Sequence, residues 1–281
     1  MRIAITGSKG FIGRRLMKKL LQKNHEVREI DILNGFDIVD WNQIKNIDNL
    51  DYIIHLAAKL FIPESFLKPR DFLEVNISGT SNVLELSRIN KAKLIFNSSY
   101  IYGKPEYLPI DENHPCSADN PYSESKIIGE RLCKLYNSIY GVKIAILRPF
   151  NVYGPQQSKQ FLLPKIIAGA RAGKVALNDP RPRRDFVYVD DLVNVFLKII
   201  EKNDVEFEIY NVGSGNSYSV AEIVEKIRCY YPQAEYYFTN VTRKHEIMET
   251  IADIKKIQRD LKWFPEVDID EGLHRIIRIE E

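Results

Sequence analysis

A glycine-rich turn near the start of the chain constrains the fold more than any other feature of the sequence. Gly7, Gly10 and Gly13 follow the apolar run Ile3–Ile5, and the amphipathic stretch Phe11–Lys23 begins directly after Gly10. Glycine here permits a tight strand-to-helix turn, close approach of backbone to a phosphate, and close packing of helix on strand. Free N–H groups and the helix dipole favour an anion at the helix N-terminus. The pattern predicts a cradle for a dinucleotide pyrophosphate; the simpler alternative is a glycine-rich turn without a ligand.

An acidic residue stands where the ribose of such a dinucleotide would lie. Asp31 is at the end of the second predicted strand, Val27–Ile32. A carboxylate there can accept hydrogen bonds from both ribose hydroxyls and would repel a 2′-phosphate, so the sequence favours NAD over NADP. Arg28 lies nearby and weakens this preference, and the alternative for Asp31 is a solvated acid at a strand end. Further cofactor contacts are expected beside the glycine turn, in the loop after the second strand and at the end of the third strand, from Phe11, Ile12, Asp37, Ile38, Leu56, Ala57 and Ala58.

Short β-branched runs alternate with helical stretches through the first half of the chain. This alternation predicts an α/β fold with a doubly wound parallel (Rossmann) sheet, covered by helices on both faces. The predicted strands are Arg2–Thr6, Val27–Ile32, Tyr52–Leu56, Leu94–Ser98 and Val142–Leu147. The predicted helices between them are Phe11–Lys23, Arg70–Ile89 and Tyr122–Tyr140.

The pattern changes after Pro149, where proline- and glycine-containing loops become frequent. We expect a helix near Phe161–Ala172, then a strand (Phe186–Val189), a helix (Asp191–Lys202) and a strand (Glu208–Val212) that rejoin the main sheet. Residues 1–150, with 186–212 rejoining the sheet, then form an NAD-binding Rossmann domain. Residues 151–185 and 213–281 form a smaller C-terminal mixed α/β lobe that binds the substrate. Because ligands of open α/β sheets bind at the carboxyl ends of strands, the site is expected between the two lobes.

Composition excludes several classes of function. The 281 residues carry a formal net charge of only +2, with both signs interspersed, which predicts neither a nucleic-acid nor a membrane surface. No apolar leader opens the chain, and no segment approaches the ~20 apolar residues of a membrane span. The three cysteines are scattered, which favours reduced thiols in a cytoplasmic protein, and the five histidines are too dispersed to predict a metal site.

A tyrosine and a lysine four residues apart predict redox chemistry. Tyr122 and Lys126 fall on one face of a predicted helix, within mutual reach. A phenol with a pKa near 10 is a poor base, but an adjacent ammonium group and a positive nicotinamide ring would lower that pKa. Tyr122 could then exchange a proton with a carbinol while hydride moves to or from the cofactor, and Lys126 could hold the nicotinamide ribose. Such a pair is common on helix surfaces; a hydroxyl at Ser98-Ser99, ending the fourth strand, favours the catalytic interpretation.

Together these residues resemble the extended short-chain dehydrogenase/reductases, specifically the nucleotide-sugar epimerase/dehydratase family. The resemblance covers nearly the whole chain. Its further markers are Asn76 within Asn-Ile-Ser-Gly-Thr, Ser98–Gly103, Arg148–Pro155, Arg184–Asp191, Ala252-Asp253 and Leu261–Pro265.

The resemblance implies roles for individual residues. Ser98, five before Gly103, would be the catalytic hydroxyl rather than Ser99, and Asn76 and Phe150 would lie near the nicotinamide. Arg184 would grip the diphosphate of a nucleotide sugar, with Arg243 as a second clamp, since two guanidinium forks suit a diphosphate. Without the resemblance, Arg181–Arg184 would be a solvated basic turn. Substrate contacts are also implied for Ser98, Ser99, Tyr100, Asn151, Leu177 and Asn178. The sequence does not specify the base, so the sugar could be linked to UDP, dTDP or GDP.

The resemblance also narrows the reaction. Sugar 4,6-dehydratases of the family carry an Asp-Glu pair where this chain has Ser99 and Tyr100, and 3,5-epimerising members carry a cysteine at the Tyr100 position. What remains is hydride transfer at C4, as in a 4-epimerase that retains its NAD. The alternative is a 4-keto-sugar oxidoreductase, which the compact length favours; a non-sugar alcohol dehydrogenase and a non-catalytic nucleotide sensor are weaker alternatives. Helices Arg70–Ile89 and Tyr122–Tyr140 form the dimer contact in similar enzymes, so a homodimer is expected.

Overall fold

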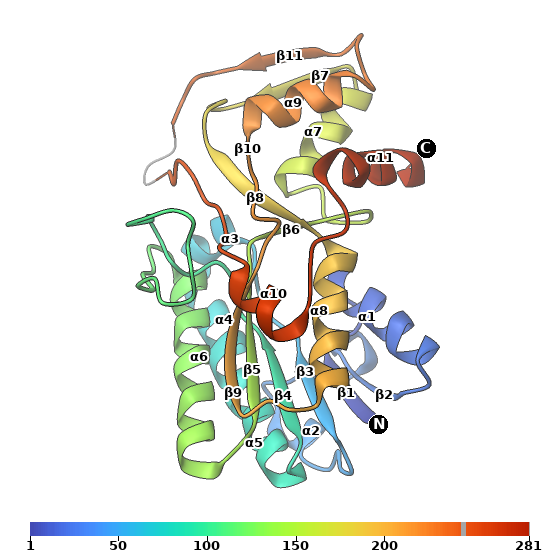
Figure 1. The fold of residues 1–281 in the computed structure, drawn as a ribbon, viewed down its shortest axis with the longest axis vertical. Helices are drawn as coiled ribbons and strands as arrows, with labels where there is room; N and C mark the ends of the chain where they lie inside the picture. Colours follow the sequence, from blue (N-terminus) through green and yellow to red (C-terminus); the bar gives the residue numbers. More distant parts are fainter. Residues whose placement is uncertain (243–245, 281) are drawn as a thin grey trace.

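A six-stranded parallel sheet forms the centre of the larger lobe (Figure 1). The structure is a computed structural model that describes residues 1–242 and 246–280. The strands follow in the order β2-β1-β3-β4-β5-β9. Their bounds are β1 (Arg2–Thr6), β2 (Glu26–Ile30), β3 (Tyr52–His55), β4 (Lys93–Asn97), β5 (Ile144–Pro149) and β9 (Phe207–Val212). The predicted parallel α/β fold is confirmed.

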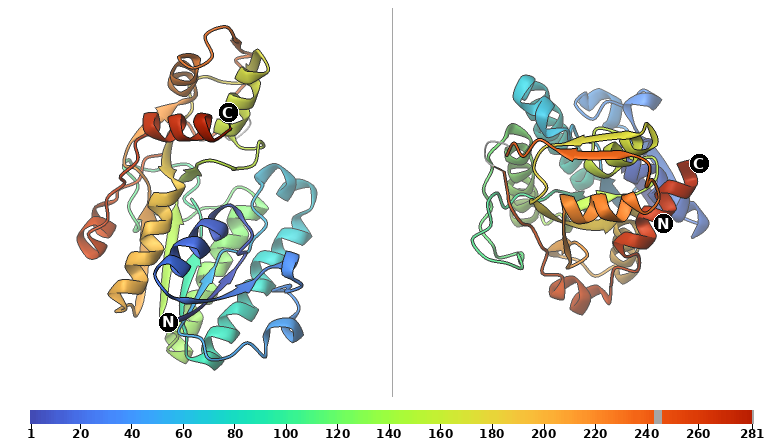
Figure 2. Two further views of the ribbon diagram at one scale, coloured as in Figure 1. Left: turned by 90° about the vertical axis from the view of Figure 1, so that its right-hand side faces the viewer. Right: turned by 90° about the horizontal axis from the view of Figure 1, so that it is seen from above.

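Helices cover both faces of this sheet because successive residues of a buried strand point to opposite sides. In β1, Ile3 and Ile5 pack in one hydrophobic cluster with α1 and α8, whereas Ala4 packs in a second cluster with α5 and α6. Figure 2 shows these layers from two further directions. The helices of this lobe are α1 (Phe11–Gln22), α2 (Trp41–Ile44), α3 (Ile62–Leu67), α4 (Pro69–Leu73), α5 (Gly79–Asn90), α6 (Pro121–Tyr140), α8 (Val189–Lys202) and α10 (Lys255–Leu261), with a short 3₁₀ turn η1 (Ile32–Asn34).

The stretch predicted as one helix over Arg70–Ile89 is interrupted. It consists of α4, a π-helical turn η2 (Glu74–Ser78) and α5. π turns inside helices often occur at functional sites. Here the turn contains Asn76, whose side chain is almost fully buried and bonded to a neighbouring loop.

The smaller lobe has a core of its own, built around two short sheets. One has the order β10-β8-β6 and the other pairs β11 with β7. Apolar residues of both sheets and of three helices form a separate hydrophobic cluster. The elements are β6 (Asn151–Tyr153), α7 (Leu162–Arg171), β7 (Lys174–Leu177), β8 (Arg183–Tyr188), β10 (Ser217–Ser219), α9 (Val220–Arg228), β11 (Glu235–Phe238) and α11 (Ile269–Glu280).

One expectation about the sheets is wrong. The strand predicted at Phe186–Val189 does not rejoin the main sheet: β8 pairs with β6 and β10 instead. Within the segment 186–212, α8 and β9 return to the larger lobe, where β9 pairs with β5. The chain therefore crosses between the lobes at the start of α8, and the expected segment 186–212 belongs to the larger lobe only after β8.

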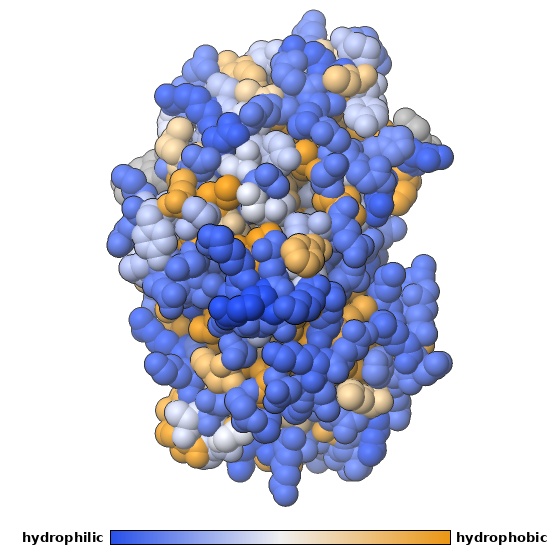
Figure 3. Space-filling view, in the orientation of Figure 1, coloured by the Kyte–Doolittle hydropathy of each residue, from blue (hydrophilic) through white to orange (hydrophobic). Residues whose placement is uncertain are grey.

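The face of the molecule in Figure 3 is mainly hydrophilic, with apolar side chains scattered across it. Among the described residues, no helix is both long and apolar enough to cross a membrane.

Candidate active site

A cavity of about 1650 Å³ lies where the carboxyl ends of the main strands meet the smaller lobe. Its lining residues come from both lobes: Gly7 is the first of them along the chain and Thr250 is the last. Most of the predicted site residues belong to its wall: Gly7, Gly10, Phe11, Ile12, Gly13, Asp31, Asp37, Ile38, Leu56, Ala57, Ala58, Ser98, Ser99, Tyr100, Tyr122, Phe150, Asn151 and Arg184. Asn76, Lys126 and Leu177 lie outside this wall, and Arg243 falls outside the described residues.

The glycine turn is too tight for any other residue. Gly7 has φ 71°, and a Cβ built on it would lie 2.8 Å from the backbone nitrogen of Ala57. A Cβ on Gly13 would collide with the carbonyl oxygen of Gly7. Gly10 caps α1 without a side chain, which leaves backbone N–H groups facing the cavity. This geometry fits a pyrophosphate, because an anion can approach these N–H groups closely.

Asp31 is fixed at the wall of the same cavity. Its two carboxylate oxygens accept hydrogen bonds from the backbone nitrogens of Lys9 (2.9 Å) and Leu33 (3.0 Å). Each oxygen has a further lone pair, so the carboxylate can also accept bonds from ribose hydroxyls. Arg28, which weakened the preference for NAD, stacks on Phe36 with its guanidinium 5.1 Å from the ring centre. The turn and Asp31 together suit the adenosine half of NAD.

Two buried polar atoms at the end of β4 have no hydrogen-bond partner within the described part of the chain. They are Oγ of Ser98 and Oδ1 of Asn97, and both residues line the cavity. The backbone nitrogen of Ser98 donates to the carbonyl oxygen of Leu147 (2.7 Å), which fixes the position of this serine. A buried hydroxyl without a partner is costly, so its presence at a cavity wall indicates a site for a ligand.

Tyr122 lines the cavity at the N-terminal end of α6, one residue after Pro121 begins the helix. Asn120 caps this helix by accepting a hydrogen bond from the backbone nitrogen of Ser123 (2.8 Å). Burial raises the pKa of the Tyr122 phenol above its ordinary value, while a side-chain hydrogen bond with Ser99 acts in the opposite direction. In the protein alone the expected lowering of this pKa is therefore not met, because desolvation of the phenolate dominates.

Lys126 lies one turn further along α6 and is only 5% exposed. Its Nζ donates to the carbonyl oxygen of Asn97 (2.7 Å) and lies 4.5 Å from the centre of the Phe96 ring. Burial lowers its pKa to about 8. The ammonium group is thus held next to the strand end that presents Ser98, and the charge of Glu130 only partly offsets the effect of burial.

Asn76 acts through the backbone of the neighbouring loop. Its Nδ2 donates to the carbonyl oxygen of Lys59 and to Oγ of Ser125 (both 2.9 Å), and its Oδ1 accepts from the backbone nitrogen of Lys59 (2.8 Å). These bonds fix the loop that follows β3, which lines the cavity at Ala57 and Ala58. The structure therefore gives Asn76 a positioning role.

The smaller lobe brings Arg184 to the opposite side of the cavity. Its Nη2 lies 2.6 Å from Oε1 of Glu246, and its Nη1 donates to the carbonyl oxygen of Ile247 (2.6 Å). Asn151 lines the cavity and donates to the carbonyl oxygen of Asp185 (3.0 Å). Leu177 is buried in the core of the smaller lobe, away from the wall.

Four cavity residues with charged side chains were not anticipated from the sequence: Lys9, Lys59, Asp119 and Glu246. Lys9 lies inside the glycine turn itself. Glu246 contacts Arg184 across 62 positions, and no local pattern signals such a contact. Lys59 and Asp119 each flank a recognised motif, the small residues after β3 and the start of α6. Their positions next to these motifs could have indicated that both residues lie at the site.

Fold and site together define an extended short-chain dehydrogenase/reductase. A Rossmann sheet brings a glycine turn, Ser98 and Tyr122 to one cavity, and Lys126 lies one helical turn behind Tyr122. Comparison with known proteins identifies the family. Residues 3–213 match the model of the NAD dependent epimerase/dehydratase family, and the chain belongs to this family.

Relatives match along nearly the whole chain. A protein of Methanocaldococcus jannaschii, named provisionally as a UDP-glucose 4-epimerase, is 34% identical over 98% of this chain and 97% of its own length. The UDP-glucuronate 4-epimerase of Thermodesulfobacterium geofontis is 30% identical over 97% of this chain and 94% of its own. The crystal structure of Thermotoga maritima UDP-glucose 4-epimerase with UDP-glucose aligns with a TM-score of 0.93 at 27% identity, covering 99% of this chain and 98% of that one. NAD is the cofactor of the family, and a Thermus thermophilus UDP-glucose 4-epimerase has been solved in complex with it.

Proposed function

We propose that the protein is an NAD-dependent 4-epimerase of a UDP-linked sugar. The observation that carries this proposal is the unpartnered hydroxyl of Ser98, which shares a cavity wall with Tyr122 and with the glycine turn. The epimerase names of similar proteins support the choice of reaction and of UDP.

The chain's own residues divide the work between the two ends of the cavity. The glycine turn and Asp31 would hold NAD, which supplies hydride acceptance and return. Arg184 and Asn151 would hold the diphosphate of the substrate, since a guanidinium fork matches phosphate oxygens. Among the predicted contacts, Phe150 lies at the cavity wall beside Asn151. We also propose two functional units, residues 1–150 with α8, β9 and α10 for the cofactor and the remainder for the sugar nucleotide.

Tyr122 would take the proton from the 4-hydroxyl of the sugar and return it, while Ser98 bonds the same oxygen. The positive charges of Lys126 and of the oxidised cofactor would stabilise the phenolate and offset the burial that raises its pKa in the protein alone. Between the two proton transfers the 4-keto sugar must turn its other face toward the cofactor. Anchoring through the diphosphate permits this turn.

At the two positions where the family's 4,6-dehydratases carry an acid and a base, this chain has no carboxylate. The chain has Ser99 and Tyr100 at the positions discussed above, and the Tyr100 hydroxyl donates to its own loop at the carbonyl oxygen of Gly103 (2.6 Å). We therefore propose that the enzyme is not a 4,6-dehydratase, although a 5,6-dehydratase is among the similar structures, with 27% identity and a TM-score of 0.90.

A reductase of 4-keto sugars is the second candidate. The GDP-6-deoxy-D-mannose reductase of Pseudomonas aeruginosa is 26% identical over 98% of this chain and 96% of its own length. The 4-epimerase relatives are covered to 94–97% of their own lengths, so chain length does not separate the two candidates.

The two candidates differ in their use of nicotinamide. An epimerase should purify with NAD(H) bound and convert UDP-glucose to UDP-galactose, or the corresponding epimer of another sugar, without net absorbance change at the nicotinamide band. Stoichiometric consumption of added NADH with a 4-keto sugar would instead identify the reductase. Tyr122→Phe should lower turnover by about 10²- to 10⁴-fold and leave bound NAD nearly unchanged.

A further inference from the structure

Tyr100 forms an aromatic part of the cavity wall near the substrate end. Its ring meets the rings of Phe150 and Tyr102 edge-on, with centroids 5.3 and 5.6 Å away. Both neighbours are buried, so the ring has firm support. The charges of Arg184 and Asp119 both act on its phenol, which places Tyr100 within reach of the proposed diphosphate end and of the start of α6.

The hydroxyl of Tyr100 is committed to its own loop. It donates to the carbonyl oxygen of Gly103, and burial raises the pKa of this phenol well above its ordinary value. A phenol that keeps its proton and has already donated it offers no hydrogen bond to a ligand anion. The ring thus presents a hydrocarbon surface to the cavity.

Cations at the wall are already matched by acids. Among the described lining residues, the cations are Lys9, Lys59 and Arg184. Lys9 lies 2.6 Å from Glu29, Lys59 lies 3.3 Å from Asp71, and Arg184 lies 2.6 Å from Glu246. A substrate diphosphate would exchange with Glu246 at Arg184, which leaves no described cation for a second anionic group on the sugar. Asp119 adds a negative charge beside Tyr100.

We propose that Tyr100 restricts the site to sugars without a carboxylate, so that neutral hexoses bind and uronic acids are excluded. The inference rests on the proposed use of UDP-sugars and deepens it. Similar proteins include 4-epimerases named for UDP-glucose and for UDP-glucuronate, so the family alone does not decide between them. The described wall offers neutral donors such as Ser99 and Asn151, but a carboxylate buried beside a hydrocarbon ring without a cation to pair with it carries a large free-energy cost.

The test compares UDP-glucose with UDP-glucuronate, which differ only at C6. Calorimetric affinities on the NAD-loaded full chain should favour UDP-glucose by about 100-fold, which corresponds to about 2.7 kcal/mol. Tyr100→Ser, which removes the ring and adds a free hydroxyl, should reduce this ratio at least about tenfold. Tyr100→Phe retains the ring and should keep the ratio.

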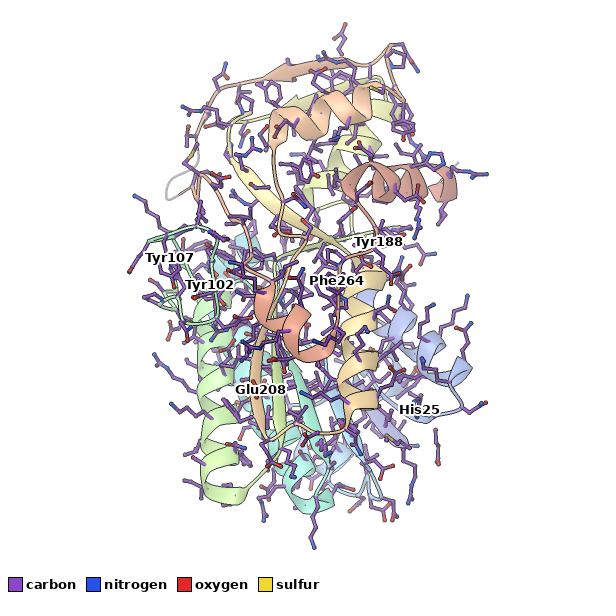
Figure 4. All side chains as sticks on the ribbon, viewed as in Figure 1. His25, Tyr102, Tyr107, Tyr188, Glu208 and Phe264 are labelled. Atoms are coloured by element: carbon purple, nitrogen blue, oxygen red, sulfur yellow. The ribbon has the colours of Figure 1, made fainter. Side chains whose placement is uncertain are left out.

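Tyr107→Ser is the matched control. Tyr107 belongs to the same connection between β4 and α6, is 43% exposed and lies outside the cavity wall. Figure 4 labels it beside Tyr102, further out on this connection. Its replacement should leave the ratio unchanged.

Equal affinity of the unaltered protein for the two sugar nucleotides would overturn the proposal, and this measurement needs no variant to fold. An unchanged ratio in Tyr100→Ser that still binds UDP would overturn it as well. A protein that prefers UDP-glucose but never changes the configuration at C4 would refute the proposed epimerase and support the role of Tyr100.

Discussion

At the scale of single residues, Lys126 combines a catalytic position with a cost in stability. Its pKa is lowered to about 8 in the folded protein, whereas an unfolded lysine keeps its proton to a pH near 10.5. Between these values the unfolded state binds more protons, so the free energy of unfolding rises with pH. Relative to Lys126→Met, the unaltered protein should gain about 2 kcal/mol between pH 7 and 9.5. Urea unfolding at both pH values measures this gain.

Lys134→Met, on the exposed side of the same helix, controls for the loss of a lysine from α6. A constant difference between the unaltered protein and Lys126→Met across this pH range would contradict the burial of the ammonium group. Turnover should fall in Lys126→Met at every pH, because the charge beside Tyr122 is lost.

Sequence motifs predicted the site residues whose positions depend only on neighbouring residues in the chain. The glycine turn and Asp31 were predicted from their place at strand ends, and Tyr122 from its spacing to Lys126. Ser98 was chosen over Ser99 by the family resemblance, and all of these residues line the cavity. Glu246 was missed, because its contact with Arg184 depends on how distant segments fold together. Distance along the chain hides such pairs from pattern analysis.

At the scale of elements, a buried ion pair joins β5 and α6, which both contribute residues to the cavity wall. Nη2 of Arg148 lies 2.6 Å from Oε2 of Glu130, with side chains 6% and 9% exposed. Burial alone would lower the pKa of Arg148, but the bonds to Glu130 outweigh it and raise that pKa, so the charge persists. Glu130→Gln should therefore reduce the free energy of unfolding by about 3–5 kcal/mol, since it leaves a buried charge without its partner.

Glu85→Gln provides the comparison, because Glu85 pairs with Arg88 at 2.7 Å on the surface of α5. Exposed pairs of this kind contribute about 0–1 kcal/mol. Equal losses of stability in the two variants, measured by chemical denaturation, would show that burial of the Arg148 pair is energetically unimportant.

Most of the main strands were predictable because they are apolar runs bounded by a turn, and the predicted bounds of the main strands agree within two residues. β2 instead mixes charged and apolar residues, as expected of a strand at the edge of the sheet. The sheet to which β8 belongs was not predictable, since a buried strand has the same pattern whichever partner it pairs with. The interruption of the helix over Arg70–Ile89 also escaped prediction, because the apolar period continues through the π turn at Asn76.

At the scale of the whole molecule, the cavity exists only because two lobes meet. The glycine turn predicted the larger lobe and a site at its carboxyl edge. The smaller lobe could be predicted only as a mixed unit, since its strands are three to six residues long and pair across distant segments. Asp185 shows how the closing loops depend on such distant contacts: its buried carboxylate accepts bonds from the backbone nitrogens of Ser214, Gly215 and Ala252.

Helices α5 and α6 expose an apolar surface that we expect to form a homodimer. The exposed fractions are 44% for Ile89, 45% for Leu135, 62% for Ile139 and 54% for Tyr140, and the two helices pack side by side. A stable dimer buries roughly 1,200–2,000 Å² in total, which favours covering these side chains. Ile139→Glu should therefore shift the protein to monomer in light scattering, because a carboxylate would be buried without a partner.

Ile279→Glu is the control for this prediction. Ile279 lies on α11 and is also 62% exposed, and its replacement should leave the dimer intact. A monomer for the unaltered protein, or dissociation in both variants, would place the interface elsewhere or remove it.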